Sequence, residues 1–177
     1  MTGNARKVAA AAAIVLFAGA SLAVAAPAAT GAPVANGFER FKALAGEWVA
    51  AEDGPMSKKG DVARYALTAA GSAVVETVFP GTAHEMVTVY HADGPDVVLT
   101  HFCMEGNQPR MRARAARGPR YDFAYDGGAN IDRERDRHMH SAWLEFVGAD
   151  EIRSEWTEHA EDKVVLVVPS HLLRKPR

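Results

Sequence analysis

The chain has 177 residues, of which 48% are hydrophobic and 24% charged, an ordinary composition for one compact domain. Its formal net charge is −2, and residues 1–25 hold two basic and no acidic side chains, so the remainder carries −4. A mildly acidic domain has no basic face to displace counterions, which excludes DNA and RNA as expected partners. The single cysteine, Cys103, excludes an internal disulfide, so an apolar core must hold the domain together.

The N-terminal residues have the layout of a secretory signal peptide. Arg6 and Lys7 precede an apolar run at residues 8–25, which ends in the small residues "AVA" that a signal peptidase cleaves after. A retained membrane anchor is the alternative, because 18 apolar residues just reach spanning length. The abundance of alanine and the Pro27 that follows favour cleavage after Ala25. We therefore expect a periplasmic or secreted protein that does not stay in the membrane.

The domain is expected at residues 36–177, after a flexible linker at residues 26–35 that is rich in small residues and proline. Asn36 and Glu39 have the spacing of a capping box, which predicts a short helix ending before Gly46. The apolar face of this helix consists of Phe38, Phe41 and Leu44.

After Gly46 the hydrophobic pattern alternates as in β-strands up to the C-terminal region. The predicted strands are Glu47–Ala51, Val62–Thr68, Ala73–Phe79, Glu85–Tyr90, Val97–Phe102, Met111–Ala115, Tyr121–Tyr125, Met139–Val147, Ile152–Thr157 and Lys163–Val168. Turn sequences such as "EDGP" and "ADGP" separate them. Closure of such a meander removes exposed strand edges. The sequence therefore predicts an all-β fold, a single up-and-down antiparallel barrel of about 8–10 strands with a short N-terminal helix.

The segment "LAGEWVA" at residues 44–50 resembles the G-x-W signature of the lipocalins and their calycin relatives. In that superfamily the tryptophan, here Trp48, plugs the closed end of a cup-shaped barrel, often beneath an arginine from a late strand. Arg153, near Trp156, is the nearest candidate for that arginine. The segments "HEMVTVYHADG", "LTHFCMEGNQPRM" and "HMHSA" are similar to a family of small exported bacterial lipocalin-like proteins. The resemblance implies a fold and no particular activity.

Two histidines stand at the start of a predicted strand, in the sequence "HMHSAWLEF". Alternate residues of a strand point to the same side, so His138 and His140 are expected to share a face with Ala142, Leu144 and Phe146. This face is the more uniformly apolar one. It is predicted to point into the barrel, with both histidines near the rim.

The hairpin at residues 84–103 is predicted to bring further polar side chains to the interior. A two-residue turn at Asp93-Gly94 would pair Met86 with His101 and His84 with Cys103. Loops of two or four residues keep the same faces, whereas a bulged three-residue loop would not. The resulting face consists of His84, Met86, Thr88, Tyr90, Val97, Leu99, His101 and Cys103. A face that gathers His, Met, Cys and Tyr is typical of a polar-lined cavity.

These faces and the loop "MEGNQPRM" at residues 104–111 supply the candidate ligand-binding residues. Side chains of this loop can hydrogen-bond a carboxylate or carbonyl at the barrel mouth. The candidates are His84, Met86, Tyr90, His101, Cys103, Asn107, Gln108, Arg110, His138 and His140. They predict an exported binding protein that holds a small, partly apolar ligand in a cavity lined by His, Met and Tyr.

A metal-dependent enzyme, of hydrolase or isomerase type, is the alternative function. Two histidines at i and i+2 on one strand present two imidazoles to one ion, and a third from another strand leaves a position open for water. His101, His138 and His140 would then bind zinc or another transition metal, with Glu85 or His84 as the proton carrier. The sequence leaves open whether the protein is an enzyme. A second alternative is a haem-binding barrel, since the resemblance to nitrobindins offers His171 as a ligand.

Overall fold

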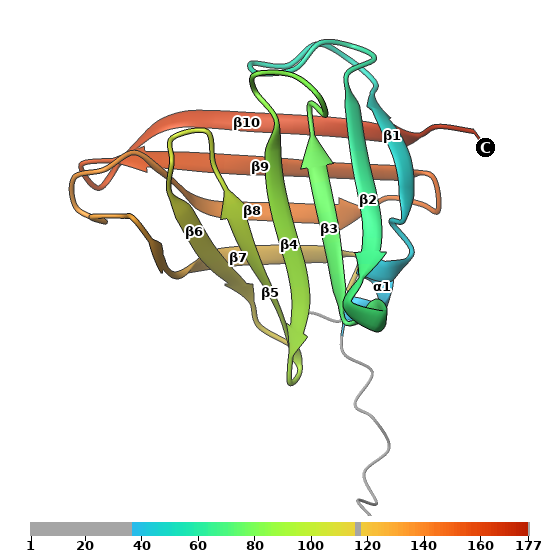
Figure 1. The fold of residues 1–177 in the computed structure, drawn as a ribbon, viewed down its shortest axis with the longest axis horizontal. Coiled ribbons are helices and arrows are strands. Elements are labelled where there is room, and N and C mark those ends of the chain that lie inside the picture. Colours follow the sequence, from blue (N-terminus) through green and yellow to red (C-terminus); the bar gives the residue numbers. More distant parts are fainter. Residues whose placement is uncertain (1–36, 116–117, 177) are drawn as a thin grey trace, which may run out of the picture. The chain divides into compact units, whose positions relative to one another are not determined.

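The computed structural model describes residues 37–115 and 118–176, which form an antiparallel β-barrel with a short helix at its start (Figure 1). Its elements are α1 (Phe38–Lys42), β1 (Gly46–Ala50), β2 (Val62–Thr68), the 3-10 turn η1 (Ala69–Gly71), β3 (Ala73–Val78), β4 (Met86–Asp93), β5 (Asp96–Phe102), β6 (Gln108–Ala113), β7 (Arg120–Ala129), β8 (His138–Phe146), β9 (Glu151–Ala160) and β10 (Lys163–Arg174). The predicted signal peptide at residues 1–25 and linker at 26–35 lie outside the described residues. Within the described part of the chain, no helix has the length and hydropathy needed to cross a membrane.

Hydrogen bonds between the first and last strands close the barrel. Each strand pairs in the antiparallel sense with the next one along the chain, and β1 pairs with β10, where Trp48 lies opposite Arg174. Figure 1 shows β2–β4 crossing β8–β10 at a steep angle, as expected when one twisted sheet folds onto itself. The predicted all-β, up-and-down barrel is confirmed, and it has ten strands.

Strands β7 and β10 extend furthest beyond their predicted ends, and both contain residues that were interpreted as strand breakers. In β10, Pro169 lies opposite Glu155 and the pairing continues on both sides of it. In β7, a Cβ at Gly128 would lie 2.8 Å from the carbonyl oxygen of Gln108 and 3.0 Å from the Cα of Pro109. Glycine at this position therefore lets β7 approach β6 closely instead of ending the strand.

Helix α1 and Trp48 fill one end of the barrel. Asn36 of the predicted capping box lies outside the described residues; the N-cap of α1 is Gly37, without a side-chain cap, and Phe41 is fully buried as predicted. Trp48 is also fully buried, and its Nε1 donates a hydrogen bond to the carbonyl oxygen of Leu44 at 2.8 Å. The loop between the end of β1 and the start of β2 lies at the other end of the barrel (Figure 1).

The arginine that covers Trp48 is Arg174 of β10, so the expectation that Arg153 takes this place is wrong. The Arg174 guanidinium carbon lies 4.3 Å from the centre of the indole ring. The same guanidinium donates hydrogen bonds to the carbonyl oxygens of Ala43 and Ala45 at 2.7 and 3.0 Å. Arg153 is half exposed and pairs with Glu151. Arg174 therefore ties the last strand to the end of α1 and to the buried indole.

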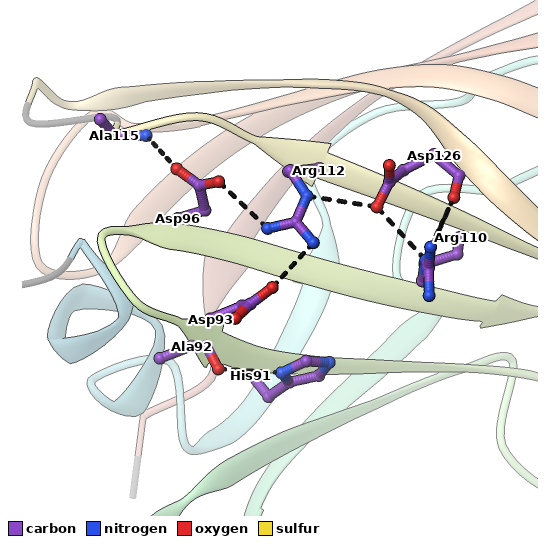
Figure 2. A network of polar contacts seen from close by, with 8 residues as sticks. All are labelled: His91, Ala92, Asp93, Asp96, Arg110, Arg112, Ala115 and Asp126. Atoms are coloured by element: carbon purple, nitrogen blue, oxygen red, sulfur yellow. Dashed lines mark hydrogen bonds and ion pairs between the residues drawn. The ribbon is translucent and has the colours of Figure 1, made fainter.

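A network centred on Arg112 ties four strands together on the outer surface (Figure 2). Its guanidinium donates to Asp93 at the end of β4, to Asp96 at the start of β5 and to Asp126 in β7, at 2.8, 3.0 and 3.2 Å. Asp96 also accepts a bond from the backbone N–H of Ala115 at 2.8 Å. That N–H, together with Arg112, holds the pKa of Asp96 below its ordinary value. One side chain thus fixes the turn between β4 and β5 against the next two strands.

Arg112→Met should lower the urea midpoint of unfolding more than Arg64→Met does. Arg112 contacts three carboxylates and is 19% exposed, whereas Arg64 is 58% exposed and forms an ion pair with Glu47. Networks of ion pairs contribute more than exposed single pairs. Urea titration followed by circular dichroism compares the two variants, and equal midpoints would show that the Arg112 network adds nothing beyond a surface pair.

Candidate ligand-binding site

The interior face of the β4–β5 hairpin carries the residues predicted for it, although the turn lies one residue further along. The loop is Gly94-Pro95, and Thr88 rather than Met86 lies opposite His101. The partner of each residue therefore shifts by two positions, which preserves the side to which each side chain points. The buried members of this face are Met86, Thr88, Tyr90, Val97, Leu99 and His101.

A cavity of about 100 Å³ lies between this hairpin, the long strands β9 and β10, and the loop between β1 and β2. Its apolar lining includes Met86, Met139 and Trp156. Glu76 and His101 are among its polar residues, and Met56 contributes from the loop. A mostly apolar lining with a few polar groups is the usual composition of a small-molecule site.

His101 is the polar group of the cavity with an unused hydrogen-bonding atom. It is 5% exposed, and its Nδ1 lies 2.9 Å from the hydroxyl oxygen of Thr88. Its ring centre lies 5.0 Å from that of Trp156. The Nε2 atom is buried and has no partner among the described residues. Burial lowers the pKa of His101 from 6.5 to about 4, so the imidazole is neutral at pH 7.

Glu76 forms a second polar group at the same cavity, buried among hydroxyls. The hydroxyls of Tyr65 and Tyr90 donate to its two carboxylate oxygens at 2.5 and 2.7 Å. Burial raises the pKa of Glu76, while hydrogen bonds from these two tyrosines and from Thr88 act in the opposite direction. Thr88 of β4 lies opposite Glu76 of β3 and opposite His101 of β5, and its hydroxyl contacts the His101 imidazole.

The sequence interpretation missed Glu76, Tyr65, Thr88 and Trp156 as site residues, although Thr88 was placed on the interior face. A signal for one of them was present, because Glu76 shares its strand face with Val74, which is fully buried. A single carboxylate on an apolar strand face is buried with that face, so it needs hydrogen-bond donors from other residues in the barrel interior. The donors come from two other strands, β2 and β4, and their pairing is not visible in the sequence.

A β-bulge at His140 changes the face on which the two histidines of "HMH" lie. Met139 pairs with Glu158 and Ser141 with Thr157, so His140 is an extra residue in β8. Met139, and not His138, continues the core side with Ala142. The predicted interior face is therefore right from Ala142 onward and wrong for His138 and His140, because a bulge interrupts the alternation.

The two histidines instead form a cluster with His159 and Tyr125. His138 is 1% exposed; its Nδ1 lies 2.8 Å from the carbonyl oxygen of Asp136 and its Nε2 lies 3.0 Å from Nδ1 of His140. The rings of His140 and His159 stack with centres 4.0 Å apart. Partial burial, then the neighbouring His159 and His138, lower the pKa of His140 to about 4.

The predicted metal ligands are not brought together. His101 contacts Thr88 and Trp156 in the cavity, whereas His138 and His140 contact each other and His159. Within residues 37–115 and 118–176, no three or more side chains of His, Cys, Asp or Glu are grouped as a metal site would require. The residues present therefore do not fit the predicted metal centre.

The remaining predicted residues lie away from the cavity lining. His84 is exposed in the turn before β4, and Cys103 is partly buried, with its pKa raised by burial. Buried Asn107 donates to the carbonyl oxygen of Arg137 at 2.7 Å and so holds the loop before β6. Two others make surface contacts: Gln108 accepts a bond from Asn130, and Arg110 pairs with Asp126. His171 lies 3.0 Å from a carboxylate oxygen of Glu151.

Of the predicted ligand-binding residues, the structure brings Met86 and His101 to the cavity, with Tyr90 bonded to Glu76 at its edge. Neither protein-family models nor curated proteins gave a match to this sequence. What is established for this chain is therefore a closed ten-strand antiparallel barrel with a small interior cavity.

Proposed function

We propose that this protein binds a small, partly apolar molecule inside the barrel and that His101 makes the principal polar contact with it. The observation that carries the proposal is that His101 lines the cavity and that its Nε2 atom is buried without a partner among the described residues. Leaving such an atom unsatisfied typically costs about 1–3 kcal/mol. A ligand that hydrogen-bonds Nε2 would recover this free energy.

The cavity limits the size of the ligand. A volume of about 100 Å³ is of the order of the ~150 Å³ apolar cavities that accept benzene, and far below a drug-sized pocket of about 300–1,000 Å³. The lining by Met86, Met139 and Trp156 favours an apolar body. A single ring or a short chain with one polar group fits both the volume and the lining.

The sequence pattern supports binding outside the cytoplasm, since residues 1–25 have the layout of a signal peptide. The resemblance of "LAGEWVA" to the lipocalin signature supports a binding function, because in that superfamily a tryptophan closes one end of a cup. The metal-dependent alternative is not supported, since His101 contacts Thr88 in the cavity, whereas His138 and His140 contact each other elsewhere. The haem alternative is not supported by this cavity, because its candidate ligand His171 does not line it and lies 3.0 Å from a carboxylate oxygen of Glu151.

Benzene and pyrrole should bind in the cavity and shift the methyl resonances of Met86 and Met139 in methyl-detected NMR, with a stoichiometry of one. Met111 is the internal control, because it is fully buried in the core and is not part of the cavity lining. His101→Phe, which fills the cavity, should abolish both shifts. His91→Phe, a change on the same hairpin outside the cavity lining, should keep them. If neither probe moves the two methyls in the unmodified protein, it does not bind ligands at this site.

A further inference from the structure

The side chains of the cavity lining that carry a charge are acidic. Glu76 belongs to the lining from β3, and Asp61 belongs to it from the end of the loop between β1 and β2. Among the described residues that line the cavity there is no lysine or arginine. His101 is neutral at pH 7, because burial lowers its pKa to about 4. The lining therefore contains carboxyl groups and no positive charge that would balance them.

The hydrogen bonds of Glu76 fit a carboxylate better than a carboxylic acid. The hydroxyl of Tyr65 donates to one of its oxygens at 2.5 Å, and the hydroxyl of Tyr90 donates to the other at 2.7 Å. Among the hydrogen bonds of the described residues, neither hydroxyl has a second partner. A protonated Glu76 would bring one more hydrogen to these contacts and leave it without an acceptor. In the ionised form every hydrogen has an acceptor.

The carboxylates of the lining have hydrogen-bond donors but no cation beside them. Burial raises the pKa of Glu76, and the groups that oppose this effect are hydroxyls, with no basic side chain of the described residues among them. The Asp61 carboxylate accepts the backbone N–H of Lys58 at 2.7 Å, whereas the ammonium of Lys58 lies 3.9 Å from a carboxylate oxygen of Asp53. A buried charge without an opposite charge nearby is costly, and a cation in the cavity would reduce this cost.

We infer that the cavity selects a small organic cation, an ammonium nitrogen that carries methyl or methylene groups, over neutral and anionic molecules of the same size. The inference rests on the proposed binding function and specifies the charge of its ligand. The apolar substituents suit the methionine side chains of the lining, Met86 and Met139. Trp156 and Phe79 also line the cavity, and aromatic rings attract cations that lie over their faces. A quaternary nitrogen has no N–H group that would need an acceptor in a mostly apolar cavity.

The first test compares choline with the dimethylbutanol in which a carbon atom replaces the charged nitrogen. The two molecules have the same shape, so their affinities differ through the charge. Choline should bind about 10- to 100-fold more tightly at pH 7, the range expected for an interaction with one charged group. The corresponding dimethylbutyrate anion should bind more weakly than the alcohol. The methyl resonances of Met86 and Met139 report binding, with Met111 as the internal control.

The second test removes the charges of the lining one at a time. Glu76→Gln keeps the shape of the side chain and should lose most of the preference for choline over the alcohol. Asp61→Asn should lose less of it, because Asp61 is only partly buried. Glu39→Gln is the matched control: it removes the same charge from a mostly exposed side chain of α1 outside the lining, and it should keep the preference. Circular dichroism shows that the variants are folded before they are compared.

The ionisation of Glu76 can be measured without any ligand. The infrared difference spectrum between the unmodified protein and Glu76→Gln at pH 7 should show the bands of a carboxylate. The band of a protonated carboxyl group would overturn the inference, because the cavity would then lack its buried negative charge.

The ligand pair separates failure of the inference from failure of the proposed function. If the alcohol binds as tightly as choline, or more tightly, the protein binds ligands in the cavity but does not select cations. If neither molecule binds, and benzene and pyrrole also fail to bind, the proposed binding function is wrong and the inference falls with it. A preference for choline that stays unchanged in both Glu76→Gln and Asp61→Asn would also overturn the inference, since the charges of the lining would not cause it.

Discussion

Trp48→Ala should lower the free energy of unfolding by about 3–5 kcal/mol, the usual cost of removing a buried tryptophan side chain. Trp48 is fully buried, donates a hydrogen bond to Leu44 and lies beneath the Arg174 guanidinium. Its loss leaves a cavity under α1 and removes the contact between the indole ring and the Arg174 guanidinium at the closed end. Urea unfolding followed by circular dichroism measures the effect, which is a large share of the stability of a single domain.

Trp143→Ala is the matched control for Trp48→Ala. Trp143 is partly exposed; its Nε1 donates to Glu155 at 3.2 Å, and the Arg120 guanidinium lies over its ring. This variant removes the same number of atoms without opening a hole in the core, so a much smaller loss is expected. Equal losses in the two variants would mean that Trp48 does not hold the closed end of the barrel.

Stability should decrease from pH 7 to pH 5, and His101 should account for about 2 kcal/mol of that decrease. Burial lowers the pKa of His101 from 6.5 to about 4. The unfolded chain therefore binds the proton first, and acid shifts the equilibrium toward unfolding from the unfolded pKa down to the folded one. The lowered pKa of His140 acts in the same direction. Urea titrations at pH 8, 7, 6 and 5 give the slope of stability against pH.

His101→Gln should flatten this slope, whatever its effect on stability at pH 8, where imidazoles are neutral in both states. Glu76 has a raised pKa and contributes in the opposite direction, but it is present in both proteins and so does not enter their difference. His101→Gln/His140→Gln should flatten the slope further. An unchanged slope in His101→Gln would show that this imidazole is not desolvated in the folded protein.

Local sequence patterns were sufficient to predict the fold class and the side of the cavity that the β4–β5 hairpin forms. Strand alternation between residues 86 and 101 predicted the interior face on which His101 and Met86 lie. The error of one residue in the turn shifted the strand pairing by two residues and left the interior face unchanged, since side-chain direction repeats every two residues. Trp48 and Phe41 were predicted to be buried from the G-x-W segment and the helical spacing, and both are.

Features that depend on contacts between strands could not be predicted in this way. The bulge at His140 exists because β8 has one more residue than β9 between two paired positions, and neither strand shows this by itself. Because of this bulge, Met139 lines the cavity, whereas His138 and His140 do not. In the same way Arg174, rather than Arg153, covers Trp48 because closure of the barrel pairs β10 with β1.

By itself, the sequence determined the alternating strands and the apolar helix face, because each depends on residues within a few positions of one another. The tertiary structure alone decided that Glu76 meets Tyr65 and Tyr90, and that the Thr88 hydroxyl lies beside the imidazole of His101. These groups come from four strands, β2 to β5, and their register fixes which polar atoms become partners. Whether a buried polar atom has a hydrogen-bond partner depends on all the residues that surround it in the fold. The unpartnered Nε2 atom of His101 is therefore a property of the assembled barrel.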